Sequence, residues 1–395
     1  MNPQLAREAA RRVARIAAEH ASAVDRDARF PAEAIDALRR ERLLSALVPA
    51  GFGGAGLTLT DVASICEILA HGCASTAMIY AMHQSQAACV IAHGGESAWQ
   101  RGFVERMASA QLLLASATSE DTTGGSLRTS GCAVQCSDGR FRIEKVAPTI
   151  SYGAHADSIL VTARRASDAP PSDQVLIVAL RDQLALEPLG HWDALGMRGT
   201  CSSGFRLVAS GDAAQILPAP FGDIANRTMQ PVSHTLWAAV WTGIAADALQ
   251  RASAHFRAQS VARPNAVSPA GSRLVRATEL LQMMKARVSA ALAAAQAAQA
   301  ADYGGGATAL PLSAQMGFTA DMNTLKTGIS SAALQVVHEA MLICGISGYR
   351  NGGRYSIGRH LRDLYSAPLM INNDRIGQNT ASLLLAQRPS VSIEA

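Results

Sequence analysis

Hydroxyl-bearing residues and glycines gather in one stretch of the sequence, residues 115–157, whose composition could bind a flat, polar cofactor. Thr118 and Ser119 offer hydroxyl groups at the start of a turn rich in Thr, Ser and Gly, and Thr149 and Ser151 offer two more after a short hairpin. Glycines in the turn let backbone N–H groups approach a ligand closely. The same residue types are common in ordinary turns, so spacing alone leaves both interpretations open.

The spacing of apolar residues around this stretch changes twice along the chain. Up to about residue 114 they recur every three or four positions, which is typical of helices, and the helical spacing returns after about residue 225. Between these points they alternate with polar residues, and Asp138-Gly139 predicts a hairpin turn. The sequence therefore predicts an α+β protein with an N-terminal α-helical domain (1–114), a small β-barrel or sandwich (115–225) and a C-terminal four-helix bundle (226–395).

Two local features of the first helical region give further expectations. Thr60-Asp61 follows a glycine-rich turn and suits a helix N-cap. Residues 73–91 are nearly all small or apolar, which predicts a buried helix. Within it we interpret His83 as a hydrogen-bonded core or interface histidine, with a role in a pocket as the alternative.

Composition excludes several classes of function. The 395 residues are 49% hydrophobic and 17% charged, as in a globular protein large enough for two or three domains. The 35 basic and 31 acidic residues are spread along the chain, so no nucleic-acid surface is expected. Seven cysteines without a Cys-x-x-Cys pair indicate no metal site and a reducing compartment. Without an apolar run of about 18 residues or a signal peptide, we expect a cytoplasmic protein and no membrane partner.

Four segments resemble motifs of the acyl-CoA dehydrogenase superfamily, in the family's order. They are a Pro- and Gly-containing turn, the hydroxyl-rich turn with its hairpin, an L-G-M-R-G-T loop, and a G-x-x-G-Y ending followed by an Arg-Asp pair, at residues 48–57, 119–157, 195–200 and 345–363. No single motif is specific, but four in order over most of the chain are. The order of helices, strands and helical bundle is also that of the superfamily.

The resemblance implies a FAD cofactor between the β-domain and the C-terminal bundle, and a substrate sandwiched against the flavin. Thr118, Ser119 and Ser151 would hydrogen-bond the flavin ring, with Ser151 nearest N5. Ser126, or Gly125 before it, would touch the FAD phosphate or the thioester arm of the substrate. Neutral hydroxyl groups suit this task because they hydrogen-bond both redox states of the ring without fixing a charge beside it.

Several cofactor positions depart from the family pattern. Thr149 stands where the family has a bulky aromatic residue that shields the flavin, and Leu342 stands at a family glutamine. Gly345 keeps the glycine of the G-x-x-G-Y ending and is included among the cofactor-binding residues. The family's R-x-x-F-G motif is not recognisable, and Arg263 is the residue that would replace its phosphate contact.

The catalytic base is the largest departure. In the family a Glu removes the α-proton of the thioester, a task that needs a carboxylate within hydrogen-bond reach. No Glu lies shortly after the Arg-Asp pair here, and the nearest carboxylate is Asp374, which we expect to be the base unless it only caps the last helix. At the family's other position for the Glu the chain has Ser233, followed by His234, which is the second candidate or a cap or interface histidine.

The resemblance implies α,β-dehydrogenation of an acyl thioester carried on CoA or a carrier protein, with electrons passing to an electron-transfer partner or oxygen. It also implies a homodimer or homotetramer. A second reaction stays open because the usual Glu is missing: a flavin-dependent monooxygenase or another non-dehydrogenating member would use the same cradle. A third possibility is a flavin-free partner subunit, favoured by the altered Arg and Gln positions and opposed by the retained hydroxyls.

Overall fold

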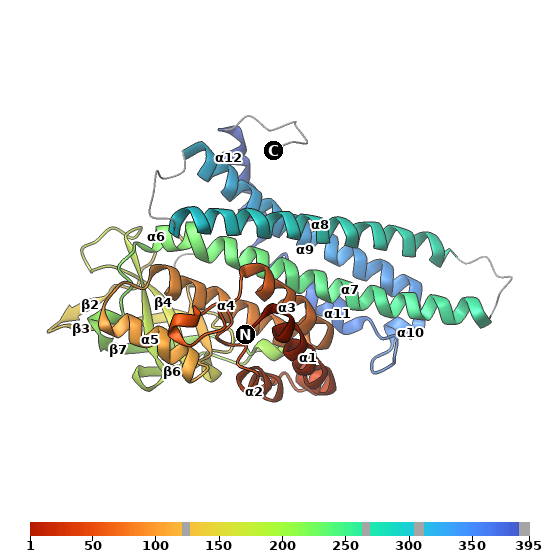
Figure 1. Ribbon diagram of the computed structural model, residues 1–395, viewed down its shortest axis with the longest axis horizontal. Helices are drawn as coiled ribbons and strands as arrows, with labels where there is room; N and C mark the ends of the chain where they lie inside the picture. Colours follow the sequence, from red (N-terminus) through yellow and green to blue (C-terminus); the bar gives the residue numbers. More distant parts are fainter. Residues whose placement is uncertain (121–126, 263–268, 304–311, 387–395) are drawn as a thin grey trace. The chain divides into compact units, whose positions relative to one another are not determined.

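The computed structural model describes residues 1–120, 127–262, 269–303 and 312–386. The chain divides into two compact units, Met1–Leu236 and Trp237–Ala395 (Figure 1). The predicted order of helices, strands and helices is confirmed, and the first change falls between Ser109, where the last N-terminal helix ends, and Leu114, where the first strand begins. The division into three domains stays a prediction.

The first part of the first unit is helical. Its helices are α1 (Pro3–Arg26), α2 (Ala32–Arg40), α3 (Leu59–Gly72), α4 (Ala74–His93) and α5 (Ala98–Ser109). The predicted N-cap at Thr60-Asp61 is wrong by two residues, because the cap of α3 is Thr58 and Asp61 completes its capping box from the third helical position. As predicted, α4 is a buried helix.

The strands form two small sheets in the same unit. They are β1 (Leu114–Ala117), β2 (Gln135–Ser137), β3 (Arg140–Ala147), β4 (Ser158–Arg164), β5 (Gln174–Leu180), β6 (Leu184–Pro188) and β7 (Phe205–Asp212). The strand orders are β1-β4-β5 and β2-β3-β7-β6, with β1 and β4 parallel and the other neighbours antiparallel. The predicted hairpin turn joins β2 to β3, with positive φ at Asp138 and Gly139, as two-residue turns of this kind require.

The N-terminal helices and the three-stranded sheet share a hydrophobic core. Val90 on α4 and Phe103 on α5 belong to one buried cluster with Leu160 on β4 and Val178 on β5. Fully burying side chains of this size stabilises a fold by about 1.5–3 kcal/mol each. The core therefore holds the sheet rigidly, and with it the loops that leave the end of β1.

The second unit is helical. The first unit ends with the short α6 (Phe221–Ile224), a π-helical turn (Ala225–Met229) and the start of α7 (Gln230–Ala262), and α7 continues into the second unit. The other helices are α8 (Ala270–Tyr303), α9 (Leu312–Cys344), α10 (Ile346–Tyr349), α11 (Gly358–Leu364) and α12 (Asn373–Leu385). Contacts of α9 with α8, α10, α11 and α12 make α9 the central helix of this unit.

Within the described residues, α9 is also the helix whose length and composition would allow a membrane span. Its segment Ala314–Cys344 contains a window of mean hydropathy 1.2, of which 44% is buried inside the protein. The core helix of a soluble protein passes the same test, so this is weak support for a span. The expected absence of a membrane partner and the cytoplasmic location stay predictions.

Candidate cofactor site

The hydroxyl-rich turn begins where β1 ends. Thr118 and Ser119 directly follow β1, whose last residue, Ala117, is still paired with β4. The pairing of β1 therefore fixes where the two residues begin. Both side chains are half-buried. The hydroxyl of Ser119 donates a hydrogen bond to the backbone oxygen of Thr149, 2.9 Å away. Two hydroxyl-bearing segments that are separated in the sequence therefore meet. Whether they bind a cofactor stays a prediction.

The backbone on either side of Ser151 is paired with the end of the L-G-M-R-G-T loop. The N–H of Ile150 donates to the backbone oxygen of Ser203 at 2.9 Å, and the N–H of Tyr152 donates to that of Thr200 at 2.7 Å. The buried hydroxyl of Tyr152 donates to a backbone oxygen at the start of β1, 2.8 Å away. These bonds fix the half-buried Ser151 relative to both β1 and the loop.

A one-way chain of hydrogen bonds starts at Ser151. The hydroxyl of Thr200 donates to the backbone oxygen of Met197 at 2.8 Å, and because a hydroxyl carries one proton, its contact with Ser202 at 2.8 Å must be donated by Ser202. By the same argument Ser151 donates to Ser202, 2.8 Å away. Ser151 Oγ therefore keeps only lone pairs, and can accept a further hydrogen bond. The side chains that form this candidate site, which we call the hydroxyl cluster, are Ser119, Ser151, Thr200 and Ser202.

The loop that carries Thr200 is held against the N-terminal helices. Arg198 Nε donates to the backbone oxygen of Asp25 at 2.7 Å. A Cβ on Gly199 would lie 2.3 Å from Cγ1 of Val24 on α1, so only glycine permits this close approach. The Arg and Gly of the motif thus fix the loop that supplies two members of the hydroxyl cluster.

His83 is a core histidine, as we interpreted it. Its Nε2 lies 2.7 Å from the backbone oxygen of Leu44, and its Nδ1 accepts from the N–H of Leu114 at 3.0 Å. This pair of contacts requires a neutral ring with the proton on Nε2. Burial lowers the pKa of His83 to about 4, which keeps the ring neutral at ordinary pH. Its role is to tie α4 to the start of β1.

The two candidate bases lie in different units and in different environments. His234, on α7 in the first unit, is fully buried. Asp374 is exposed in the first turn of α12 in the second unit, and its N–H donates to Oδ1 of Asn372 at 2.9 Å. Asn372 is therefore the residue that caps α12. The catalytic role of each candidate stays a prediction.

The remaining predicted cofactor residues are distributed as follows. Gly125, Ser126 and Arg263 lie outside the described residues. Gly345 is the N-cap of α10 and has φ of 54°, a conformation that favours glycine. Leu342, at the position of the family glutamine, is 44% exposed.

Sequence reasoning missed the contribution of Ser202. Its hydroxyl links Ser151 to Thr200, yet it lies outside the motifs that drew attention to those two residues. The available signal was its place directly after the L-G-M-R-G-T loop, in a run of small and hydroxyl-bearing residues. Only the pairing of two segments that are about 50 residues apart reveals the contact.

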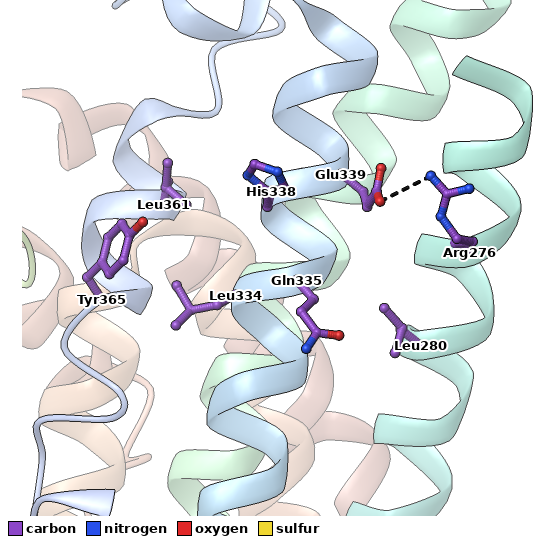
Figure 2. Close-up of a pocket in the computed structure, with 8 residues that line it drawn as sticks. All are labelled: Arg276, Leu280, Leu334, Gln335, His338, Glu339, Leu361 and Tyr365. Atoms are coloured by element: carbon purple, nitrogen blue, oxygen red, sulfur yellow. Dashed lines mark hydrogen bonds and ion pairs between the residues drawn. The ribbon is translucent and has the colours of Figure 1, made fainter. Parts of the chain in front are cut away.

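A separate pocket of about 470 Å³ lies within the second unit, between α8, α9 and α11 (Figure 2). One end carries Glu339, which forms ion pairs with Arg273 at 2.9 Å and Arg276 at 3.2 Å. Desolvation opposes ionisation of Glu339, but the hydrogen bonds from the two arginines outweigh it and lower its pKa. Leu334, Leu361 and Tyr365 lie toward the other end. None of the sequence-predicted site residues lines this pocket.

Comparisons with known proteins agree with the resemblance seen in the motifs. Residues 2–111 match the family "Acyl-CoA dehydrogenase, N-terminal domain". The chain is 25% identical over 358 residues to the amino sugar nitrososynthase DnmZ of Streptomyces peucetius, covering 88% of this chain and 84% of that protein. It is 29% identical over 243 residues to cyclohex-1-ene-1-carbonyl-CoA dehydrogenase of Geobacter metallireducens, covering 60% and 63%.

A solved structure extends the likeness to nearly the whole chain. FMN-bound TdsC from Paenibacillus sp. A11-2, a dibenzothiophene monooxygenase, superposes with a TM-score of 0.84 at 18% identity, covering 99% of this chain and 100% of that one. At this identity the likeness concerns the fold alone, and it confirms the predicted acyl-CoA dehydrogenase-like architecture of helices, small sheets and C-terminal helices. The family match over residues 2–111 and the acyl-CoA dehydrogenase relatives support membership of the acyl-CoA dehydrogenase superfamily, and with it a flavin-dependent oxidoreductase.

Proposed function

We propose that the protein is a flavin-dependent monooxygenase that transfers one oxygen atom from O₂ to a nucleophilic nitrogen or sulfur atom of a small organic substrate. The observation that carries this proposal is that the protein retains the hydroxyl cluster but lacks the catalytic Glu of the family. Neither family position for the catalytic Glu holds one, since Ser233 occupies the first and no Glu lies shortly after the Arg-Asp pair at the second. Oxygen transfer to a nucleophile needs no base that removes an α-proton from a thioester.

The hydroxyl cluster fits an isoalloxazine ring. Its members are neutral, so they can contact the ring in either redox state without fixing a charge. Ser151 Oγ, whose proton is committed to Ser202, is left as an acceptor. The N5 atom of a reduced flavin carries a hydrogen and that of an oxidised flavin does not, so Ser151 would favour the reduced form. A bound reduced flavin would supply the two electrons that O₂ needs to transfer one atom and release the other as water.

This assignment gives each group of residues a limited task. Ser151 and Ser119 would orient the ring, and the chain through Ser202 and Thr200 would keep the Ser151 proton turned away from it. The buried side chains around β1 and β4 would exclude water from beneath the site. We propose that O₂ is the acceptor and that a separate reductase supplies the reduced flavin.

FMN is the flavin that we propose, in place of the FAD implied by the resemblance. In the family, the glutamine replaced here by Leu342 and the R-x-x-F-G motif that is not recognisable here belong to the FAD contacts. Leu342 and Ile346 are both substantially exposed and apolar, so they offer no hydrogen bond to an adenosine diphosphate. FMN binding by TdsC is in line with this choice. We expect FMN to bind at least as tightly as FAD.

The test combines a flavin reductase, FMN and isotopically labelled O₂ with amine and thioether substrates. We expect labelled oxygen in the product, and no anaerobic bleaching of the oxidised flavin by acyl-CoA thioesters. Bleaching by an acyl-CoA without added reductant would overturn the proposal. A colourless protein that takes up no flavin would instead support a flavin-free partner subunit.

Dehydrogenation of an acyl thioester is the second candidate, and two observations favour it. One relative is a cyclohex-1-ene-1-carbonyl-CoA dehydrogenase, and Asp374 is exposed, so its carboxylate is accessible as a base. His234 is less suited because it has no exposed surface. The acyl-CoA bleaching test separates this reaction from oxygen transfer.

A further inference from the structure

Lys145 is a fully buried lysine in the interior of the β-region. Side chains of β3 alternate between exposed and buried, so Lys145 takes an inward place in line with Phe141 and Ile143. Its ammonium donates to the backbone oxygen and to the hydroxyl of Thr162 on β4, at 2.8 and 2.9 Å. Because β3 and β4 belong to different sheets, the ammonium links the two sheets.

Glu120 supplies the opposite charge. Its Oε1 lies 3.0 Å from Nζ of Lys145 and accepts from the hydroxyl of Ser130, while its Oε2 accepts from the N–H of Gly131 at 2.7 Å. Only 6% of Glu120 is exposed. Three acceptors therefore face the three donors of the ammonium. All three donors of the ammonium therefore have an acceptor.

For each partner, the charge of the other opposes the effect of burial on its pKa. Desolvation raises the pKa of Glu120, but the charge of Lys145 and the hydrogen bonds to the carboxylate outweigh it, so the pKa stays below its ordinary value. Desolvation also lowers the pKa of Lys145, and the charge of Glu120 opposes this. The two charges thus maintain each other.

The ion pair lies at the origin of the hydroxyl-rich turn. Glu120 directly follows Ser119, whose hydroxyl donates to the backbone of Thr149. The carboxylate is held from one side by Lys145 and from another by Gly131, which fixes its direction as well as its distance. We propose that Glu120 and Lys145 are positioning residues that set Ser119 and the start of the turn for flavin binding. This inference rests on the proposed function.

Stability alone does not account for the pair. The desolvation of two buried charges offsets most of their attraction, and well-packed apolar side chains of similar volume are often as stable or more stable. An apolar pair has no directional contacts, however, so it would not fix the backbone next to Ser119. Placement and stability can therefore be separated by removing both charges at once.

The experiment compares the double variant Glu120→Met/Lys145→Met with the control Glu144→Met/Arg206→Met. The control removes an exposed ion pair at 3.3 Å between β3 and β7, next to Lys145 in sequence. We expect the first variant to keep the far-UV circular dichroism and the thermal midpoint of the wild type. It should bind FMN roughly tenfold more weakly, which corresponds to the loss of one hydrogen bond to the flavin ring. The control should bind FMN as the wild type does. A folded Glu120→Met/Lys145→Met protein with wild-type FMN affinity would overturn the inference.

A second variant keeps the test decisive if the double variant does not fold. Glu120→Gln retains the size of the side chain and an acceptor for Gly131, but removes the charge. We expect weaker FMN binding and faster amide hydrogen exchange at Gly131 than in the control Glu144→Gln. Unchanged affinity and exchange would contradict the inference. Hydrogen exchange is measured on the flavin-free protein and therefore tests the role of the ion pair independently of flavin binding. A wild-type protein that binds no flavin would refute the proposed function, but the exchange measurement would still test whether the pair holds the backbone at Gly131.

Discussion

The hydroxyl oxygens of Ser151 and Ser202 lie 2.8 Å apart, and Ser151 is the donor in this contact. The direction follows from Thr200, whose single proton goes to the backbone oxygen of Met197. Ser151 was selected from the sequence because it carries a hydroxyl group. Its contact with Ser202, about 50 positions further along the chain, uses its proton and leaves Ser151 as a hydrogen-bond acceptor. This directed contact underlies the preference for reduced flavin in our account.

Replacing Ser151 with Ala should weaken the binding of reduced FMN more than that of oxidised FMN. The lost acceptor serves only the N–H of the reduced ring, and one such hydrogen bond corresponds to roughly a tenfold change in affinity. Anaerobic titration with photoreduced FMN, beside an aerobic titration with oxidised FMN, measures both values. Ser203→Ala is the control, because this neighbour contributes its backbone oxygen to the pairing of the two segments. Equal losses for the two redox states would contradict the assigned direction.

Asp374→Asn separates the two proposed reactions. Asp374 is exposed, and Asn372 rather than Asp374 caps α12, so the substitution should not disturb the fold. We expect oxygen transfer from O₂ to continue at the wild-type rate, since that reaction uses no base at this position. If the protein instead reduces its flavin with an acyl-CoA, and Asp374→Asn abolishes that reduction, dehydrogenation is the correct assignment.

His83 should make the fold sensitive to acid. In the unfolded chain its pKa is near 6.5, and in the folded protein it is about 4. Between these values only the unfolded state binds the proton, so the free energy of unfolding falls as pH drops from 6.5 to 4, by roughly 3 kcal/mol in total. Above pH 6.5 the ring is neutral in both states and this dependence vanishes.

Urea unfolding of His83→Gln at several pH values measures this contribution. The variant should be less stable than the wild type at pH 7, because the contacts to Leu44 and Leu114 are altered, and its stability should fall less steeply below pH 6.5. His191→Gln, at an exposed histidine, should keep the wild-type slope. A wild-type slope in His83→Gln would show that His83 does not titrate in this way.

Lys326 should give a dependence of the same sign as His83, in an alkaline pH range. Its ammonium is fully buried on α9 and donates to the backbone oxygen of Ala367 and to Oδ1 of Asn373, and desolvation lowers its pKa to about 8. Between pH 8 and its ordinary value near 10.5 the unfolded state holds the proton that the folded state releases, so stability rises with pH through this window.

Comparison of wild type and Lys326→Met isolates that effect from other alkaline titrations. The variant loses two hydrogen bonds and should be less stable at each pH, and its deficit should grow from pH 8 to pH 10. Lys285→Met, at an exposed lysine on α8, serves as control. A deficit that is constant over this range would mean that Lys326 keeps an ordinary pKa in the folded protein.

Local patterns in the sequence were enough to predict much of the fold and part of the candidate site. The alternation around Asp138-Gly139 predicted the hairpin, and the apolar helix around His83 predicted a core histidine. The same alternation on β3 puts Lys145 on the buried face, so its inward position was available from the sequence, although its partner Glu120 was not. Pairing between distant segments, as between Ser151 and Ser202, depends on tertiary register that no local pattern encodes.

Helix capping shows the limit of local reasoning. Thr58 and Thr60 are the same residue type two positions apart, and the capping box with Asp61 decides in favour of Thr58. At α12, a run of polar residues likewise contains the cap, Asn372, and the candidate base, Asp374, side by side. Residue type identifies such segments, while backbone geometry assigns the roles within them.

The most direct test of the account is a titration of the purified, flavin-free protein with FMN, followed by quenching of flavin fluorescence. We expect saturable binding of one FMN per chain, weakened by Ser151→Ala in the reduced state. The contradicting result is the absence of saturable binding of both FMN and FAD by a correctly folded protein.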